Sequence, residues 1–218
     1  MALQDRWDTV RERMVLAAQR AGRRPEEITL LAVTKVFPVE VLLEAYSLGM
    51  REFGENYVQE FERKFPFVGG CEGARFHLIG HLQSNKAKKA SEMFDVIQTV
   101  DSAKLAGRLE GPLEVMLEVK LSEEESKHGA APEELEALVA AVRGTEGLTL
   151  TGLMTMPPWS EDAEVARPYF RKLRGLAERY GVAQLSMGMS HDLEVAIEEG
   201  STMVRVGTAL FGSRKGLL

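Results

Sequence analysis

A lysine follows an almost unbroken apolar run near the N-terminus, in the stretch ITLLAVTKVFPVE (28–40). Lysine is among the residues least often buried without a partner, so Lys35 either reaches solvent or has a purpose at the end of a buried strand. Partial removal from water lowers the pKa of a lysine amine, and the free amine then forms a Schiff base with a carbonyl compound. Lys35 is therefore the first candidate for a covalent binding residue.

Two segments near the C-terminus have the composition of anion-binding turns. The segment SMGMSHDLEVA (186–196) offers Gly188, the Ser190 hydroxyl and the start of a helix, and VRVGTALFG (204–212) turns at Gly207 and Thr208. Backbone N–H groups in such turns bind phosphate. An ordinary helix cap at Ser190 and a tight turn at Gly207 are the alternatives.

A lysine combined with a phosphate site leaves two classes open: a Schiff-base aldolase acting on a sugar phosphate, and a protein that holds pyridoxal 5′-phosphate. Arg205 bears on this choice because it precedes Gly207 by two residues and shares its face of a strand. A guanidinium only donates hydrogen bonds, which suits a pyridine nitrogen kept unprotonated. An arginine paired with a carboxylate at a strand end is the other interpretation.

Short apolar runs alternate with helical patterns along the whole chain. The strand-like runs are 28–35, 51–55, 76–80, 95–101, 113–120, 148–156, 184–189 and 203–210. The helix-like stretches between them are 38–48, 56–65, 85–93, 102–109, 132–143, 160–180 and 191–199. This alternation predicts parallel strands with crossover helices, and eight repeats favour a closed (β/α)8 barrel, the TIM barrel. A doubly wound open sheet is the alternative, but its G-x-G-x-x-G fingerprint is absent after the first strand.

No linker or composition break divides the chain, so we expect residues 1–218 to form a single barrel domain with an extra N-terminal helix over MALQDRWDTVRERM. Chemistry in such barrels gathers at the C-terminal ends of the strands. The predicted ends carry Lys35, Glu55, Asn56, Gly80, His81, Asp101, Ser102, Met154 to Met156, Ser190, Gly207 and Thr208. This set has the character of a binding site.

Charge and composition narrow the partners. A net charge of −6 argues against a broad nucleic-acid surface. Cys71 is the only cysteine, the N-terminus does not have the pattern of a signal peptide, and no apolar run approaches the length of a membrane helix. We expect a cytoplasmic protein without nucleic-acid or membrane partners, without a metal site, and monomeric, since no separate dimerisation segment is visible.

Several motifs together resemble one family. They are LLAVTK, FGENYVQE, FHLIGHLQSNK, ESKHG, GLMTM and LSMGMSHDLEVAIEEGSTMVRVGTALFG. They are similar to those of the YggS/PROSC family of pyridoxal phosphate-binding proteins, also called the pyridoxal phosphate homeostasis proteins. The resemblance implies a single barrel like the N-terminal domain of alanine racemase, without the second, β-rich domain of that enzyme.

The resemblance also implies roles for individual residues. Lys35 would form the internal aldimine, and Arg205 would face the pyridine nitrogen. Ser190, Gly207 and Thr208 would hold the phosphate, while Asn56, His81, Ser186 and Met187 would line the pocket. Lys127 in ESKHG matches a family lysine on a mobile loop. Where relatives often read VSKTKP, this chain reads VTKVFP, so a second lysine near the cofactor is missing.

We therefore expect a pyridoxal 5′-phosphate homeostasis protein that holds the cofactor on Lys35 and releases it to acceptors such as apo-enzymes, and that is not an enzyme. An amino-acid racemase of the alanine racemase-like fold is the alternative. Racemisation needs acid–base groups on both faces of the substrate, and alanine racemases take one of them, a tyrosine, from a partner subunit. The tyrosines here, Tyr46, Tyr57, Tyr169 and Tyr180, all lie in predicted helices, so none is an obvious second base.

Overall fold

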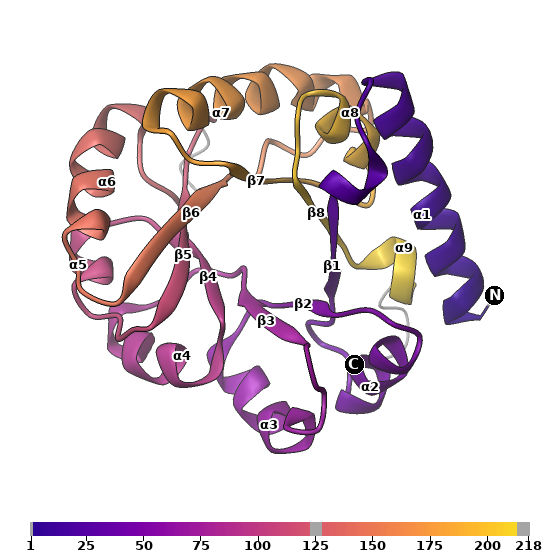
Figure 1. Cartoon of the computed structure of the whole chain (residues 1–218), viewed down its shortest axis with the longest axis horizontal. Helices are drawn as coiled ribbons and strands as arrows, with labels where there is room; N and C mark the ends of the chain where they lie inside the picture. Colours follow the sequence, from indigo (N-terminus) through magenta and orange to yellow (C-terminus); the bar gives the residue numbers. More distant parts are fainter. Residues whose placement is uncertain (1, 123–127, 213–218) are drawn as a thin grey trace.

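The computed structural model describes residues 2–122 and 128–212. In this part of the chain, eight parallel strands pair in sequence order and the last pairs with the first, which closes the sheet into a barrel (Figure 1). The strands are β1 (Thr29–Val33), β2 (Glu52–Glu55), β3 (Arg75–Leu78), β4 (Val96–Val100), β5 (Leu113–Glu118), β6 (Leu148–Met154), β7 (Gln184–Met189) and β8 (Met203–Val206). The predicted (β/α)8 barrel is confirmed.

Helices form an outer ring around the barrel (Figure 1). The α-helices are α1 (Leu3–Arg20), α2 (Val39–Ser47), α3 (Val58–Val68), α4 (Ala87–Met93), α5 (Ala103–Ala106), α6 (Leu135–Arg143), α7 (Arg167–Tyr180), α8 (Leu193–Glu198) and α9 (Thr208–Phe211). Short 3₁₀ turns are η1 (Pro25–Glu27), η2 (Ser84–Lys86), η3 (Pro132–Glu134) and η4 (Ala163–Ala166). The predicted N-terminal helix is α1, which lies along α8 and α9. Within the two described ranges, no helix is both long and apolar enough to cross a membrane.

Several predicted strands are too long at their C-terminal ends, and two of these errors concern the site. The run 28–35 stops being a strand after Val33, so Lys35 lies in the β1–α2 turn rather than in the strand itself. The run 203–210 stops at Val206, because the chain turns at Gly207 and enters α9. Apolar composition predicted the strands but could not predict where the backbone leaves the sheet.

The side chains of the strands divide into two layers with the period of two typical of barrels. An inner cluster fills part of the barrel interior: Leu31, Val33, Ile79, Met116 and Met203. The larger cluster includes residues of alternate positions on the same strands, such as Val115 and Leu117, together with those of the surrounding helices. The interior is not wholly apolar, because Gln98, Ser186 and Arg205 are buried there as well.

Candidate cofactor-binding site

Most of the predicted site residues lie at one end of the barrel. Lys35 follows β1, Asn56 follows β2 and Ser190 follows β7, while Arg205 and Gly207 belong to β8 and the turn after it. Since all strands are parallel, their C-terminal ends open on the same side. This end of the barrel is called the mouth below.

The turns after β7 and β8 meet at Ser190. The N–H of Ala209, in the first turn of α9, donates a hydrogen bond to the Ser190 hydroxyl oxygen (3.2 Å). Gly188 has φ +92°, and a Cβ atom there would lie 2.4 Å from the Cβ of Ala196. Only glycine therefore fits this bend. The hydrogen bond from Ala209 to Ser190 joins the two segments that the sequence suggested for phosphate binding, and the joined turns are called the Ser190–Ala209 recess below.

Helix α1 supports this recess from outside. Arg13 donates to the Ser190 carbonyl oxygen (3.0 Å) and forms an ion pair with Glu194 (2.6 Å). Arg6 donates to the carbonyl oxygen of Leu210 in α9. The sequence analysis predicted the helix but not this role, because contacts between residues 177 to 204 positions apart leave no local pattern.

Arg205 is buried inside the barrel, with 4% of its surface exposed. Its Nη1 donates to the carbonyl oxygen (2.7 Å) and hydroxyl (2.9 Å) of Ser186, and its Nη2 donates to the carbonyl oxygen of Thr155 (2.9 Å). Burial lowers the pKa of Arg205 to about 10, against the attraction of Asp192 and Glu118, which raises it. Among the described residues, Arg205 makes no carboxylate ion pair, contrary to the second sequence interpretation.

Lys35 is partly exposed in the β1–α2 turn. The next residue, Val36, has φ +62°, a left-handed conformation that is rare for a β-branched residue. The Val36 N–H donates to Glu60 Oε1 of α3 (2.5 Å). A tertiary contact therefore holds the backbone beside Lys35 in a conformation that valine disfavours.

A buried ionic network lies behind this turn. The ammonium of Lys64 donates to Glu55 (2.8 Å), to Glu60 (2.9 Å) and to the carbonyl oxygen of Thr34 (2.9 Å). The Thr34 hydroxyl donates to Glu55 (2.7 Å). Burial raises the pKa of Glu55, and the charge of Lys64 opposes this shift. The network contacts Thr34 and Val36, the two neighbours of Lys35. The sequence analysis did not predict it, because a lysine in a predicted helix, such as Lys64, is normally exposed.

Glu118, at the end of β5, is a second residue that the sequence analysis missed. It shares the inward-facing parity of Met116, it is 2% exposed, and its Oε2 has no hydrogen-bond partner among the described residues. Burial and then the charge of Asp101 raise its pKa to about 7, while Arg205 opposes the rise. Because β1 and β5 are four strands apart in a ring of eight, Glu118 lies across the mouth from Lys35.

The remaining predicted residues differ in how they contribute to the mouth. The ring of His81 stacks on His128 (3.8 Å between centroids), and its Nδ1 is 3.7 Å from Asp101 Oδ2. Burial, and then His128, lower the pKa of His81. Asn56 Oδ1 is buried without a partner in the described part of the chain. The Asn56 backbone touches Gly80, where a Cβ would lie 2.1 Å from the Asn56 carbonyl oxygen.

Three expectations need correction or lie outside the described residues. The Met187 side chain is fully buried in the outer hydrophobic cluster, and its neighbour Ser186 faces the interior instead, as the period of two requires. Tyr57 precedes α3 rather than lying within it, and it is 58% exposed. Lys127 lies outside the described residues. Among the residues that are described, no group of His, Cys, Asp and Glu could hold a metal ion.

The sequence of this chain matches known proteins over most of its length. Residues 7–215 match the family model of the alanine racemase N-terminal domain. The chain is 46% identical over 219 residues to the pyridoxal phosphate homeostasis protein of Escherichia coli (strain K12), covering 94% of each chain. The chain belongs to the pyridoxal phosphate homeostasis protein family. The family protein of Aquifex aeolicus (strain VF5) is 42% identical, with 97% of this chain and 98% of that protein covered.

Solved structures agree with this membership. PipY of Synechococcus elongatus with PLP bound has a TM-score of 0.79 and 36% identity, covering 93% of this chain and all of that chain (100%). Alanine racemase of Clostridium difficile 630 has a TM-score of 0.75 at 14% identity, covering 98% of this chain and 57% of that chain. The second likeness shows the fold alone, and it confirms the expected alanine racemase-like barrel.

Proposed function

We propose that this chain binds pyridoxal 5′-phosphate in the mouth of the barrel, as a Schiff base on Lys35, and serves cofactor homeostasis by holding and releasing it. The hydrogen bond from Ala209 to the Ser190 hydroxyl carries this proposal, because it joins two anion-binding turns at the same end of the barrel as Lys35. The names of the relatives and the PLP-bound PipY structure support the choice of cofactor.

The donor groups of the mouth fit a phosphorylated pyridine aldehyde. The Ser190 hydroxyl, which accepts from Ala209 and keeps its own proton to donate, and the N–H group of Thr208 suit a phosphate. Arg205 uses Nη1 and Nη2 for its protein hydrogen bonds, and of its five N–H donors the Nε–H and one Nη2–H are left for an acceptor such as an unprotonated ring nitrogen. The buried Asn56 Oδ1 adds a polar group.

The cofactor supplies an aldehyde that condenses with a primary amine, with loss of one water. The protein residues bind and orient it. The Ser190–Ala209 recess holds the phosphate, Arg205 faces the ring nitrogen, and the clamped β1–α2 turn directs the Lys35 amine. Release to apo-enzymes, the monomeric state and the cytoplasmic location remain predictions.

The test is reductive trapping of the cofactor with borohydride, followed by peptide mapping. We expect an absorption band of bound cofactor in the wild type, its loss in Lys35→Ala, and the trapped label on Lys35. Lys120→Ala is the matched control, because Lys120 is another partly exposed lysine just after β5 at the same end of the barrel. A label on any other lysine contradicts the assignment of Lys35.

An amino-acid racemase is the second candidate function, and Glu118 is the observation that favours it. A buried carboxyl with a pKa of about 7, across the mouth from Lys35, has the character of a general acid or base. The sequence analysis found no second base because it considered only the tyrosines. The homeostasis names of the relatives favour the carrier function.

Incubating the cofactor-loaded protein with L-alanine in deuterated water separates these two functions. Sustained exchange of the α-proton and formation of D-alanine, lost in both Lys35→Ala and Glu118→Gln, would establish a racemase. Cofactor release without turnover supports the carrier.

A further inference from the structure

A row of buried polar side chains crosses the inside of the barrel. Barrel interiors are usually filled by branched apolar residues, yet here Arg205, Ser186, Gln98 and His77 are each 0–4% exposed. The row ends at Glu52, at the start of β2, whose side chain is 23% exposed. These five residues are called the interior polar row, and they come from five strands, β2, β3, β4, β7 and β8.

Every link in the row is a hydrogen bond. Arg205 Nη1 donates to the Ser186 hydroxyl (2.9 Å), and this hydroxyl donates to Gln98 Oε1 (2.6 Å). Gln98 Nε2 lies 2.9 Å from His77 Nδ1, and His77 Nε2 lies 2.5 Å from Glu52 Oε2. The row therefore begins with a buried cation in the mouth and ends with a carboxylate at the opposite end of the barrel.

The donors of the row all point in one direction. An amide nitrogen only donates, so His77 Nδ1 must accept from Gln98. The remaining proton of a neutral His77 is then on Nε2, which donates to Glu52. Hydrogen bonds aligned in this way polarise and strengthen one another. These aligned hydrogen bonds stabilise the buried charge of Arg205, which has no carboxylate ion pair among the described residues.

We propose that Glu52, His77, Gln98 and Ser186 are positioning residues that hold the Arg205 guanidinium toward the ring of the bound cofactor. The proposal rests on the proposed function. Ser186 fixes Nη1, Gln98 fixes the direction of the Ser186 hydroxyl, and the His77–Glu52 pair fixes the orientation of the Gln98 amide. Arg205 then keeps its free N–H donors directed at the site.

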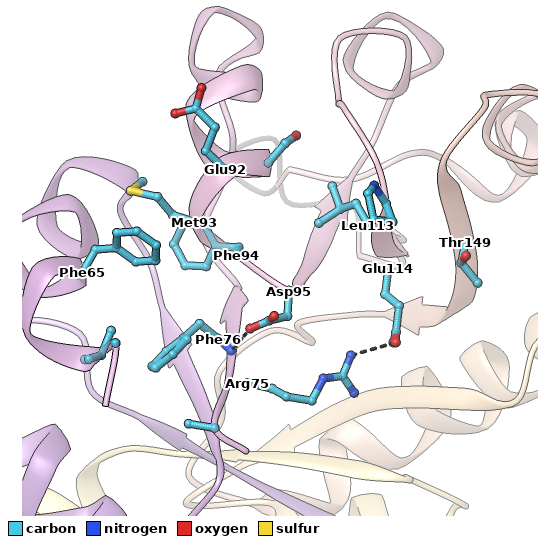
Figure 2. A pocket seen from close by; sticks show the side chains of 15 residues that line it. Phe65, Arg75, Phe76, Glu92, Met93, Phe94, Asp95, Leu113, Glu114 and Thr149 are labelled. Carbon is cyan, nitrogen blue, oxygen red and sulfur yellow. Dashed lines mark hydrogen bonds and ion pairs between the residues drawn. The ribbon is translucent and has the colours of Figure 1, made fainter. Parts of the chain in front are cut away.

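A matched control lies at the same end of the barrel as Glu52. Glu114, at the start of β5, forms an ion pair with Arg75 (2.8 Å), and its side chain is 36% exposed. This pair lies in a groove of about 780 Å³ that is lined also by Phe76 and Asp95. Figure 2 shows the pair together with these two side chains. Arg75 and Glu52 are paired neighbours on β3 and β2. Glu114 thus shares the surroundings of Glu52 without belonging to the row.

The experiment compares wild type, Gln98→Leu, Glu52→Gln and Glu114→Gln, each titrated with pyridoxal 5′-phosphate at one pH. The absorption maximum of the bound cofactor and the dissociation constant are measured. We expect a shifted maximum and about tenfold weaker binding for Gln98→Leu, the scale of one hydrogen bond to a charged group. Glu52→Gln should shift the maximum and weaken binding about two- to threefold, and Glu114→Gln should match wild type.

Thermal unfolding of each variant without cofactor checks that it is folded. If Gln98→Leu does not fold, the test relies on Glu52→Gln. This variant only replaces one carboxylate oxygen with an NH2 group, at a partly exposed position. Variants that are less stable but keep the wild-type maximum and affinity would overturn the positioning role and leave the proposed function standing. A wild-type protein that binds no cofactor would overturn the proposed function and this inference together.

Discussion

The turn after β1 and the turn after β7 both border the mouth, but they obtain their shapes differently. In the first, Val36 adopts φ +62° and is held by Glu60 and the buried Lys64 network. At the second, Gly188 near the end of β7 adopts φ +92° without a Cβ, and Asp192 in the turn accepts from the Met189 N–H (2.6 Å). The first shape is imposed by another helix, whereas the bend at Gly188 involves residues that are close together along the chain.

This difference separates a reactive group from a binding recess. A valine in the left-handed region costs about 1–3 kcal/mol and persists only where its surroundings enforce it. The backbone that carries Lys35 is therefore under tension from α3, while the Ser190–Ala209 recess is locally relaxed. Variants that remove the enforcing contacts, or that add a Cβ to the relaxed turn, test this contrast.

The largest expected effect is from Lys64→Met. It leaves Glu55 buried without its cation, so the free energy of unfolding should fall by about 3–5 kcal/mol. Chemical denaturation measures this change. Lys89→Met is the control, because its ion pair with Glu62 is about half exposed and should contribute less than about 1 kcal/mol. Equal losses in the two variants would show that the network does not support the β1 turn.

The next effect concerns Glu118, which faces the mouth between the two turns. Its folded-state pKa of about 7 exceeds its ordinary value of 4.5. The folded state therefore keeps a proton that the unfolded state releases, and this contribution to stability is complete below pH 4.5 and lost as the pH rises through 7.

Glu118→Gln should remove that pH dependence. The free energy of unfolding of the variant minus that of wild type should be about 3 kcal/mol higher at pH 8.5 than at pH 4.5. This value follows from about 1.4 kcal/mol for each pKa unit. Denaturation at both values measures the difference, with the exposed Glu178→Gln as control. A difference near zero would show that water reaches Glu118 and that the mouth does not isolate the turns.

Gly188→Ala should destabilise the relaxed turn by about 2 kcal/mol, because alanine disfavours φ +92° and its Cβ would overlap Ala196. Thermal or chemical unfolding measures the loss. Gly175→Ala in α7 is the opposite control, since its Cβ would meet nothing within 4 Å, and it should stabilise the helix by up to about 1 kcal/mol. A harmless Gly188→Ala would contradict the local origin of the bend.

The smallest effect should come from Val36→Gly, which relieves the left-handed valine and should raise the free energy of unfolding by about 1 kcal/mol. Val36 is 40% exposed, so little burial is lost. Val41→Gly, within α2, should instead destabilise the protein by about 0.5–1 kcal/mol. Destabilisation by both variants would mean that Val36 is not strained.

Sequence reasoning predicted the strands and turns around the mouth where the pattern is local, and it failed where contacts join distant parts of the chain. The turns at Ser190 and Gly207 were predicted from their composition. The period of two placed Arg205 on the strand face of Gly207, and the Arg205 side chain is buried inside the barrel. The same period should have turned Met187 outward, and it was overlooked there. Glu118 was overlooked although it lies in a predicted apolar strand with the parity of Met116, and Lys64 was missed because a lysine in a predicted helix is normally exposed.

The sequence by itself determined the barrel and the two turns at Ser190 and Gly207. Alternating apolar runs and helical periods, with glycine and serine at the turns, depend on interactions between residues close along the chain. Only the tertiary structure decided the conformation beside Lys35 and the interior polar row. Glu60 reaches Val36, and Glu52 connects to Arg205, only after the ring of strands has closed and brought distant residues within hydrogen-bond distance.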